Sequence, residues 1–270
     1  MTAGIPAAAA IRAAATEIAE GVHDSQFVVD VFQTGSGTST NMNANEVIAN
    51  MALRELGEPR GRYEVVNPND HVNLSQSTND VYPTAVRLTM LREVPMLVKS
   101  QELLVAAFEA KDREFHDIIK VGRTQLMDAV PMRLGSEFKA FAVTVGEDIE
   151  RLREFSSLLR EVNLGGTAVG TGLNAPAGYA QAVAKELADL TGLNLVTAPN
   201  KFEALASCDA LVQAHGALKG LAVSLMKIAN DVRWLASGPR SGLGEITIPE
   251  NEPGSSIMPG KVNPNSGPMM

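Results

Sequence analysis

Apolar residues recur at every third or fourth position along a stretch near the C-terminus. They are Leu211, Ala214, Leu218, Leu221, Leu225, Ile228, Val232 and Leu235. Alternating steps of three and four residues place these side chains on one stripe of an α-helix. Val212, Val223 and Met226 are apolar too, which predicts that neighbours cover more than one face. This stretch is therefore predicted to be a long helix inside a bundle.

Three further stretches predict helices. One runs from Phe138 to Leu159 with the same steps, and a second spans about Met96 to Ile119, with Pro95 in its first turn. A shorter helix is predicted over Asn43–Leu56. Aromatic residues are scarce (4%), which favours helices over sheets. The predicted fold class is all-α: a bundle of long helices joined by irregular loops rich in Gly, Ser and Thr.

Composition excludes several kinds of protein. The net charge of −8 argues against a nucleic-acid partner. The sequence contains no run of about 20 apolar residues, so no membrane span is predicted. The single cysteine, Cys208, rules out an internal disulfide and fits a reducing compartment, so a cytoplasmic location is expected. The four histidines are scattered, so neither a metal site nor another cofactor is expected.

Five loops between the predicted helices carry hydroxyls, amides and exposed backbone N–H groups. They read "TGSGTSTNMN", "NLSQSTND", "GRTQLMDAVP", "NLGGTAVGTGLNAP" and "GSSIMPGKVNP". Convergent donors with one or two cations are what a small dicarboxylate requires. Taken singly, such loops are more often turns and helix caps. From composition and spacing alone, the chain is a helical bundle with several donor-rich loops.

Together the loops are similar to those of a known family. "GSSIMPGKVNP" resembles the signature loop of the fumarase/aspartase superfamily, and the other loops match its remaining motifs in order. The resemblance spans about Ile11 to Pro264. It implies an all-α fold of the fumarase/aspartase type and a homotetramer in which three subunits build each active site. It also implies reversible elimination from a small dicarboxylate, with fumarate as product.

The resemblance also implies a role for individual residues. Ser255 matches the general base, which removes a proton beside a carboxylate, on a loop that closes as a lid. The carboxylate that becomes a dianion is held by residues matching Thr38, Ser77, Thr78 and Ser256, with Ser36 beside them. The other carboxylate is gripped by residues matching Thr124, Lys261 and Asn263. Asn79 and Gln125 match positions near the leaving group. An alkoxide at Ser255 needs stabilisation, which Lys261 and backbone N–H groups are expected to provide.

Superfamily members are longer than this chain. The sequence is therefore expected to be a fragment without the N-terminal segment and the C-terminal helices. Residues 1–75 are expected to be the remainder of an N-terminal domain with the first substrate loop, and residues 76–270 an incomplete central bundle that ends just after the signature loop. Pro268 replaces a glutamate that the family usually has.

The two halves of the chain resemble different branches of the superfamily. Residues from about Phe27 to Asn163 resemble aspartate ammonia-lyases, whereas those from about Ala198 onward resemble class II fumarases. Fumarases usually have His where Gln125 stands, and an amide cannot relay protons to hydroxide. L-aspartate is therefore the expected substrate, giving fumarate and ammonia. The alternatives are hydration of fumarate to L-malate and an inactive helical scaffold.

Overall fold

The computed structural model describes residues 4–32, 37–238 and 240–263. The chain divides into two compact units: Met1–Glu93 with Ser156–Leu211, and Val94–Phe155 with Val212–Met270. We refer to them as unit 1 and unit 2 and describe each by itself. They interleave along the sequence, whereas the sequence suggested a boundary at residues 75 and 76. That boundary remains a prediction about domains.

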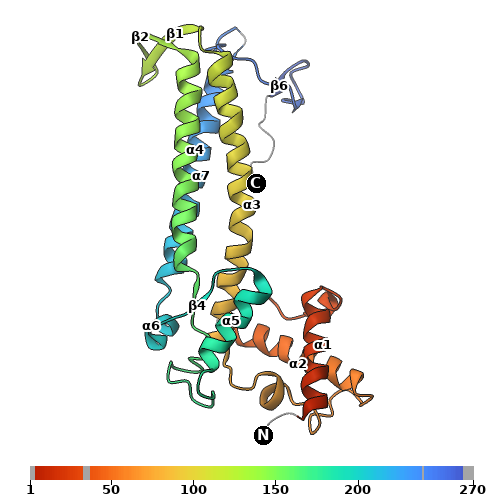
Figure 1. Ribbon diagram of the computed structural model, residues 1–270. Coiled ribbons are helices and arrows are strands. Elements are labelled where there is room, and N and C mark those ends of the chain that lie inside the picture. Colours follow the sequence, from red (N-terminus) through yellow and green to blue (C-terminus); the bar gives the residue numbers. More distant parts are fainter. Residues whose placement is uncertain (1–3, 33–36, 239, 264–270) are drawn as a thin grey trace. The chain divides into compact units, whose positions relative to one another are not determined.

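Unit 1 contains the complete helices α1, α2, α5 and α6 and the start of the long helix α3 (Figure 1). Its helices are α1 (Ile5–Ala19), α2 (Thr38–Glu55), the first turns of α3 (Thr78–Glu114), α5 (Tyr179–Thr191) and α6 (Lys201–Ala206), with short helical turns η1 (Asp24–Gln26) and η2 (Pro68–Val72). Two short strands, β3 (Glu161–Val162) and β4 (Val196–Thr197), pair in parallel. A core cluster joins Ala10 and Ala14 of α1 to Leu53 of α2 and to Val66.

Unit 2 contains the remaining turns of α3, most of α4 (Leu134–Leu158) and most of α7 (Asp209–Leu235), which run side by side in Figure 1. Phe138 of α4 packs against Phe108 of α3 and against Phe115, which directly follows α3, at ring-centroid distances of 6.4 and 5.2 Å. Strand β1 (Ile119–Thr124) pairs with β2 (Met127–Arg133), and β5 (Glu252–Pro253) with β6 (Val262–Asn263), both antiparallel. The all-α prediction is confirmed, with small two-stranded pieces added at the loops.

Helices α4 and α7 confirm the predicted periodic stretches. On α7 the buried residues are Ala214, Leu221, Ile228 and Leu235, spaced seven apart along the predicted stripe. One helix was placed wrongly: α3 begins at Thr78 rather than Met96, so Pro95 lies in its interior. A proline inside a helix costs about 3 kcal/mol, and burial of Leu91, Val94 and Val98 around it offsets that cost.

Two other expectations are corrected. Helix α3 ends at Glu114, and Ile119 already belongs to β1. "GRTQLMDAVP", predicted as an irregular loop, contains the turn of the β1–β2 hairpin.

No helix in the described part of the chain is long and apolar enough to cross a membrane.

Candidate active site

The expected site residues are distributed over both units. Thr38, Ser77, Thr78 and Asn79 lie in unit 1, and Thr124, Gln125, Ser255, Ser256, Lys261 and Asn263 lie in unit 2. Ser36 lies outside the described residues. Each of these two groups is positioned by its own unit.

In unit 1, the first turns of α2 and α3 come together. Gly37, the N-cap of α2, has a φ of 77°. A side chain there would overlap the ring of Tyr82, so only glycine allows α2 to approach α3 this closely. Asn41 of α2 donates to the Thr78 hydroxyl at 3.1 Å. Two helix N-termini, each beginning with a threonine, thus meet in unit 1, and the dipole at a helix N-terminus favours an anion.

A capping box opens α3. The Ser77 hydroxyl accepts from the Asn79 backbone N–H at 3.3 Å, and the Asp80 carboxylate accepts from the Ser77 N–H at 2.9 Å. This reciprocal pattern is the one that S-x-x-D predicts, and "STND" carries it in the sequence. This motif was not among the features predicted from the sequence. The box fixes the backbone that carries Ser77, Thr78 and Asn79.

Asp80 also ties this loop to a distant one. Its side chain is fully buried, and its second carboxylate oxygen accepts from the backbone N–H groups of Gly165 at 3.1 Å and Thr167 at 2.8 Å. Burial raises the pKa of the Asp80 carboxyl, against the opposing effect of these N–H donors. The Asn79 side-chain amide donates to the carbonyl of Ala168 at 2.9 Å. Asp80 is therefore the anchor that holds "NLSQSTND" on "NLGGTAVGT".

A pocket of about 640 Å³ opens beside this anchored loop. It is lined by Asn69, Asp70, Asn73, Leu74, Ser75, Gln76, Ser77, Thr167, Ala168, Leu173 and Asn174. The lining consists mostly of amides and hydroxyls, as expected for a small polar ligand. Asn67 has a structural role in this part of unit 1. Its side-chain oxygen accepts from the N–H groups of Asn69 and Asp70 and caps η2.

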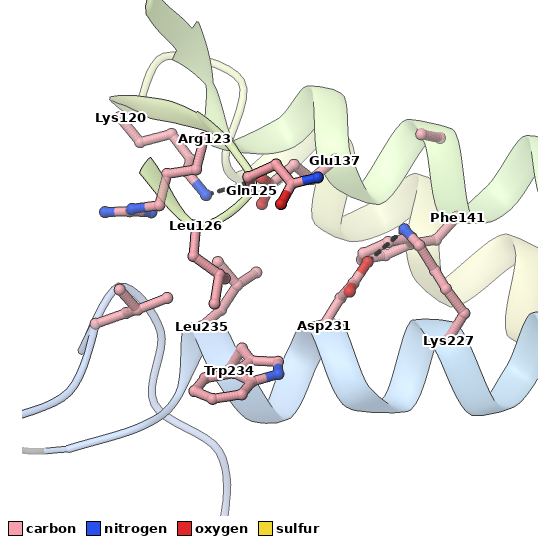
Figure 2. Close-up of a pocket in the computed structure, with 12 residues that line it drawn as sticks. Lys120, Arg123, Gln125, Leu126, Glu137, Phe141, Lys227, Asp231, Trp234 and Leu235 are labelled. Atoms are coloured by element: carbon pink, nitrogen blue, oxygen red, sulfur yellow. Dashed lines mark hydrogen bonds and ion pairs between the residues drawn. The ribbon is translucent and has the colours of Figure 1, made fainter. Parts of the chain in front are cut away.

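In unit 2, Thr124 ends β1 and the next two residues form the hairpin turn. Gln125 and Leu126 both have positive φ, 54° and 64°. A two-residue turn of this kind suits Asn-Gly, and side chains with a Cβ are strained there. Gln125 and Leu126 line a pocket of about 470 Å³ with Trp234 and Asp231 of α7 (Figure 2). An expected site residue therefore sits at a strained position.

Replacing Leu126 with glycine should raise the free energy of unfolding of the chain by about 1 kcal/mol, because glycine adopts positive φ without strain. Leu126→Ala is the matched control, since it removes the side chain but keeps the Cβ. Urea unfolding followed by circular dichroism measures both variants. Equal stabilities of the glycine and alanine variants would contradict strain in the turn.

The remaining expected residues share one small hairpin, residues 252–263, which we call the C-terminal hairpin. Strands β5 and β6 form its stem, and the Gly254 N–H donates to the Lys261 carbonyl at 2.8 Å. A side chain at Gly254 would collide with that of Asn263. Ser255, Ser256, Lys261 and Asn263 are thus held on one 12-residue element.

Within this hairpin the Ser255 oxygen is an acceptor. It accepts from the backbone N–H groups of Ile257 at 3.3 Å and Met258 at 3.2 Å. Two N–H donors stabilise negative charge on an oxygen, as in an oxyanion hole. The expected backbone stabilisation of a Ser255 alkoxide is therefore consistent with the geometry. The described residues contain no group of three or more His, Cys, Asp or Glu that could hold a metal ion.

Comparison with known proteins identifies the family. The chain matches the model of a family described as lyase over residues 2–269. It is 59% identical over 256 residues to the class II fumarate hydratase of Myxococcus xanthus, and 58% identical over 262 residues to that of Ralstonia nicotianae. These matches cover 94% and 97% of the chain but 55% and 57% of the relatives. The chain thus spans a little over half the length of these curated relatives.

Solved structures agree with the sequence relatives. A crystal structure of fumarate lyase:delta crystallin from Brucella melitensis bound to cobalt has a TM-score of 0.92 and 58% identity, over 97% of this chain and 57% of that one. A class II fumarase from Schistosoma mansoni has a TM-score of 0.91 and 40% identity, over 97% and 58%. The chain belongs to this lyase family, within the fumarase/aspartase superfamily.

Proposed function

We propose that the whole protein is a class II fumarate hydratase, which interconverts fumarate and L-malate. The strongest support is that the relatives at 58–59% identity carry this name. The expectation of L-aspartate as substrate, drawn from Gln125, finds no support among these relatives. These relatives favour the alternative, hydration of fumarate to L-malate, which the C-terminal half of the chain indicated.

The proposed chemistry uses the residues as the resemblance assigns them. Ser255 removes a proton from the carbon of malate that lies beside a carboxylate. Electrons move into that carboxylate, which becomes a dianion, and hydroxide leaves the neighbouring carbon as water after protonation. Thr38, Ser77, Thr78 and Ser256 would stabilise the dianion, while Thr124, Lys261 and Asn263 would hold the other carboxylate. Asn79 would contact the leaving group.

Two features of the structure support these roles. Thr38 and Thr78 begin helices whose N-termini meet in unit 1, and such N-termini favour developing negative charge. Ser255 accepts two backbone N–H groups, which lowers the cost of ionising its hydroxyl.

Ultraviolet absorbance of fumarate tests the proposal. The assay uses an extended protein: this chain joined to those parts of the Myxococcus xanthus relative that lie outside the match. L-malate and L-aspartate are supplied in parallel. Fumarate from malate alone supports the hydratase. Fumarate from aspartate alone would restore the substrate expected from Gln125, and silence with both would exclude the proposed function.

L-aspartate is a second candidate substrate, because Gln125 stands where fumarases usually have a histidine. Its amide is neutral at every pH, whereas a histidine can carry a proton to or from hydroxide. Replacing Gln125 with histidine in the extended protein should therefore raise kcat for malate by about tenfold, below the roughly hundred- to ten-thousandfold that general acid–base catalysis typically contributes. Gln125→Asn is the control that keeps an amide. A histidine variant no faster than the asparagine variant would contradict a proton-transfer role at this position.

We also propose that the protein assembles as a homotetramer with shared active sites. Val212, Val223, Met226 and Trp234 of α7 are between 50 and 66% exposed. At 100° per residue they lie opposite the buried stripe that contains Leu221. Apolar residues on both sides of a helix are typical of one that is covered on both sides. Light scattering of the extended protein should give four times the subunit mass, and a monomer would contradict this proposal.

The cytoplasmic location remains a prediction.

A further inference from the structure

A cluster of four charged side chains in unit 2 has no role in the proposed chemistry. Glu245 forms ion pairs with Lys120 at 2.5 Å and with Arg123 at 2.6 Å. Lys120 forms a second ion pair with Glu137 at 2.8 Å. Two cations therefore face two carboxylates, and the cluster is electrically balanced.

This cluster is largely shielded from water. The Lys120 side chain is 6% exposed and that of Glu245 15%. Burial opposes ionisation of Glu245, but the hydrogen bonds from Lys120 and Arg123 outweigh it and hold its pKa below the ordinary value. Ion pairs at such sites are screened less than those on the surface, and loss of one partner leaves the others unpaired.

Glu245 is fixed through its backbone as well. Its N–H donates to the carbonyl of Leu235, the last residue of α7, at 2.8 Å. The segment before it folds back on the same helix end, where the Gly244 N–H donates to the Ser237 carbonyl at 2.8 Å. Its main chain is thus attached to α7 and its side chain to β1.

Arg123 and Glu245, the two partners of this ion pair, both lie close in sequence to expected site residues. Arg123 is adjacent to Thr124 and two residues before Gln125, at the strained turn of the β1–β2 hairpin. Glu245 begins the stretch that leads, ten residues later, to Ser255 in the C-terminal hairpin. One carboxylate therefore links the segment that carries the proposed base to the strand that carries a proposed substrate contact.

We propose that Glu245 is a positioning residue. Through its ion pairs with Lys120 and Arg123, it holds the start of the segment that leads to Ser255 against the β1–β2 hairpin. This inference rests on the proposed function for its kinetic consequence. An error of about 1 Å in the placement of reacting groups can cost a hundredfold in rate. The carboxylate therefore acts on catalysis through Ser255 and Thr124 without touching the substrate.

Glu245→Gln in the extended protein tests the proposal, because it keeps the shape of the side chain and removes its charge. We expect kcat/KM for malate to fall by about ten- to a hundredfold, with KM raised, and Glu245→Asp to restore part of the loss. A merely structural role would lower the amount of active protein and leave KM unchanged. The matched control is Glu250→Gln, an exposed glutamate on the same segment.

A second measurement does not depend on turnover. Trypsin cleavage after Lys261, in the C-terminal hairpin, should become about tenfold faster in Glu245→Gln and Arg123→Gln. The double variant should be no worse than Glu245→Gln alone, because Glu245→Gln already breaks the ion pair with Arg123. Wild-type cleavage rates with an unchanged KM would overturn the proposal. If the wild-type extended protein is inactive, the proposed function fails, while the cleavage rates still decide the role of Glu245.

Discussion

Replacing Ser255 with alanine should lower kcat for malate in the extended protein by about a hundred- to ten-thousandfold, the contribution of a general base. The hydroxyl accepts the N–H groups of Ile257 and Met258, so its oxygen is placed to carry negative charge. Alanine removes that oxygen and leaves the backbone of the hairpin able to fold. Fumarate binding should be nearly unchanged, because the carboxylate contacts come from other residues.

Initial rates and isothermal titration with fumarate separate these effects. The control is Ser241→Ala, an exposed serine that precedes the same segment. It should keep wild-type kcat. If Ser255→Ala retains more than about a tenth of the wild-type rate, another group removes the proton and the role assigned to Ser255 is wrong. If both rate and binding are lost, Ser255 holds the substrate rather than acting as its base.

Replacing Asp80 with asparagine should lower the free energy of unfolding by about 2–4 kcal/mol, the largest stability effect that we expect. The two carboxylate oxygens accept from opposite sides, one from Ser77 and the other from Gly165 and Thr167. An amide has one oxygen and one NH₂ group, so on one side a donor would face a donor. At least one buried backbone N–H is then left without a partner.

Thermal and urea unfolding of the 270-residue chain measure this effect. Asp70→Asn is the matched control, since Asp70 is exposed in the same unit and should change stability by less than about 0.5 kcal/mol. An equal effect of the two substitutions would show that Asp80 does not anchor the loop. In the extended protein, Asp80→Asn should also raise KM, because Ser77, Thr78 and Asn79 depend on this anchor.

The sequence predicted helices correctly where apolar residues recur at every third or fourth position. The stripe from Leu211 to Leu235 is such a pattern, and α7 matches it. Prediction failed for the start of α3, where Pro95 indicated a helix start. Packing on both sides of this proline keeps the helix continuous, and packing cannot be deduced from the proline itself.

The expected site residues were found by resemblance, and the structure places them on particular elements. Ser255, Ser256, Lys261 and Asn263 occupy a nine-residue stretch, so their proximity is already set by the sequence. Thr38 and Thr78 are distant in sequence, and the contacts of Gly37 and Asn41 bring their helices together. The capping box of α3 was readable in "STND", whereas the remote partners of Asp80 were not.

The helical class, the apolar stripe of α7 and the Gly- and Pro-rich composition of the C-terminal hairpin follow from the amino-acid sequence alone. Each depends on neighbours within a few residues, where periodicity and turn chemistry act directly. The contacts of Asp80 with Gly165 and Thr167, and the ion pairs of Glu245 with Lys120 and Arg123, are seen in the folded chain but not in the sequence. These partners are separated by 85 or more residues. No spacing rule encodes such pairs, because folding of the whole unit brings them into contact.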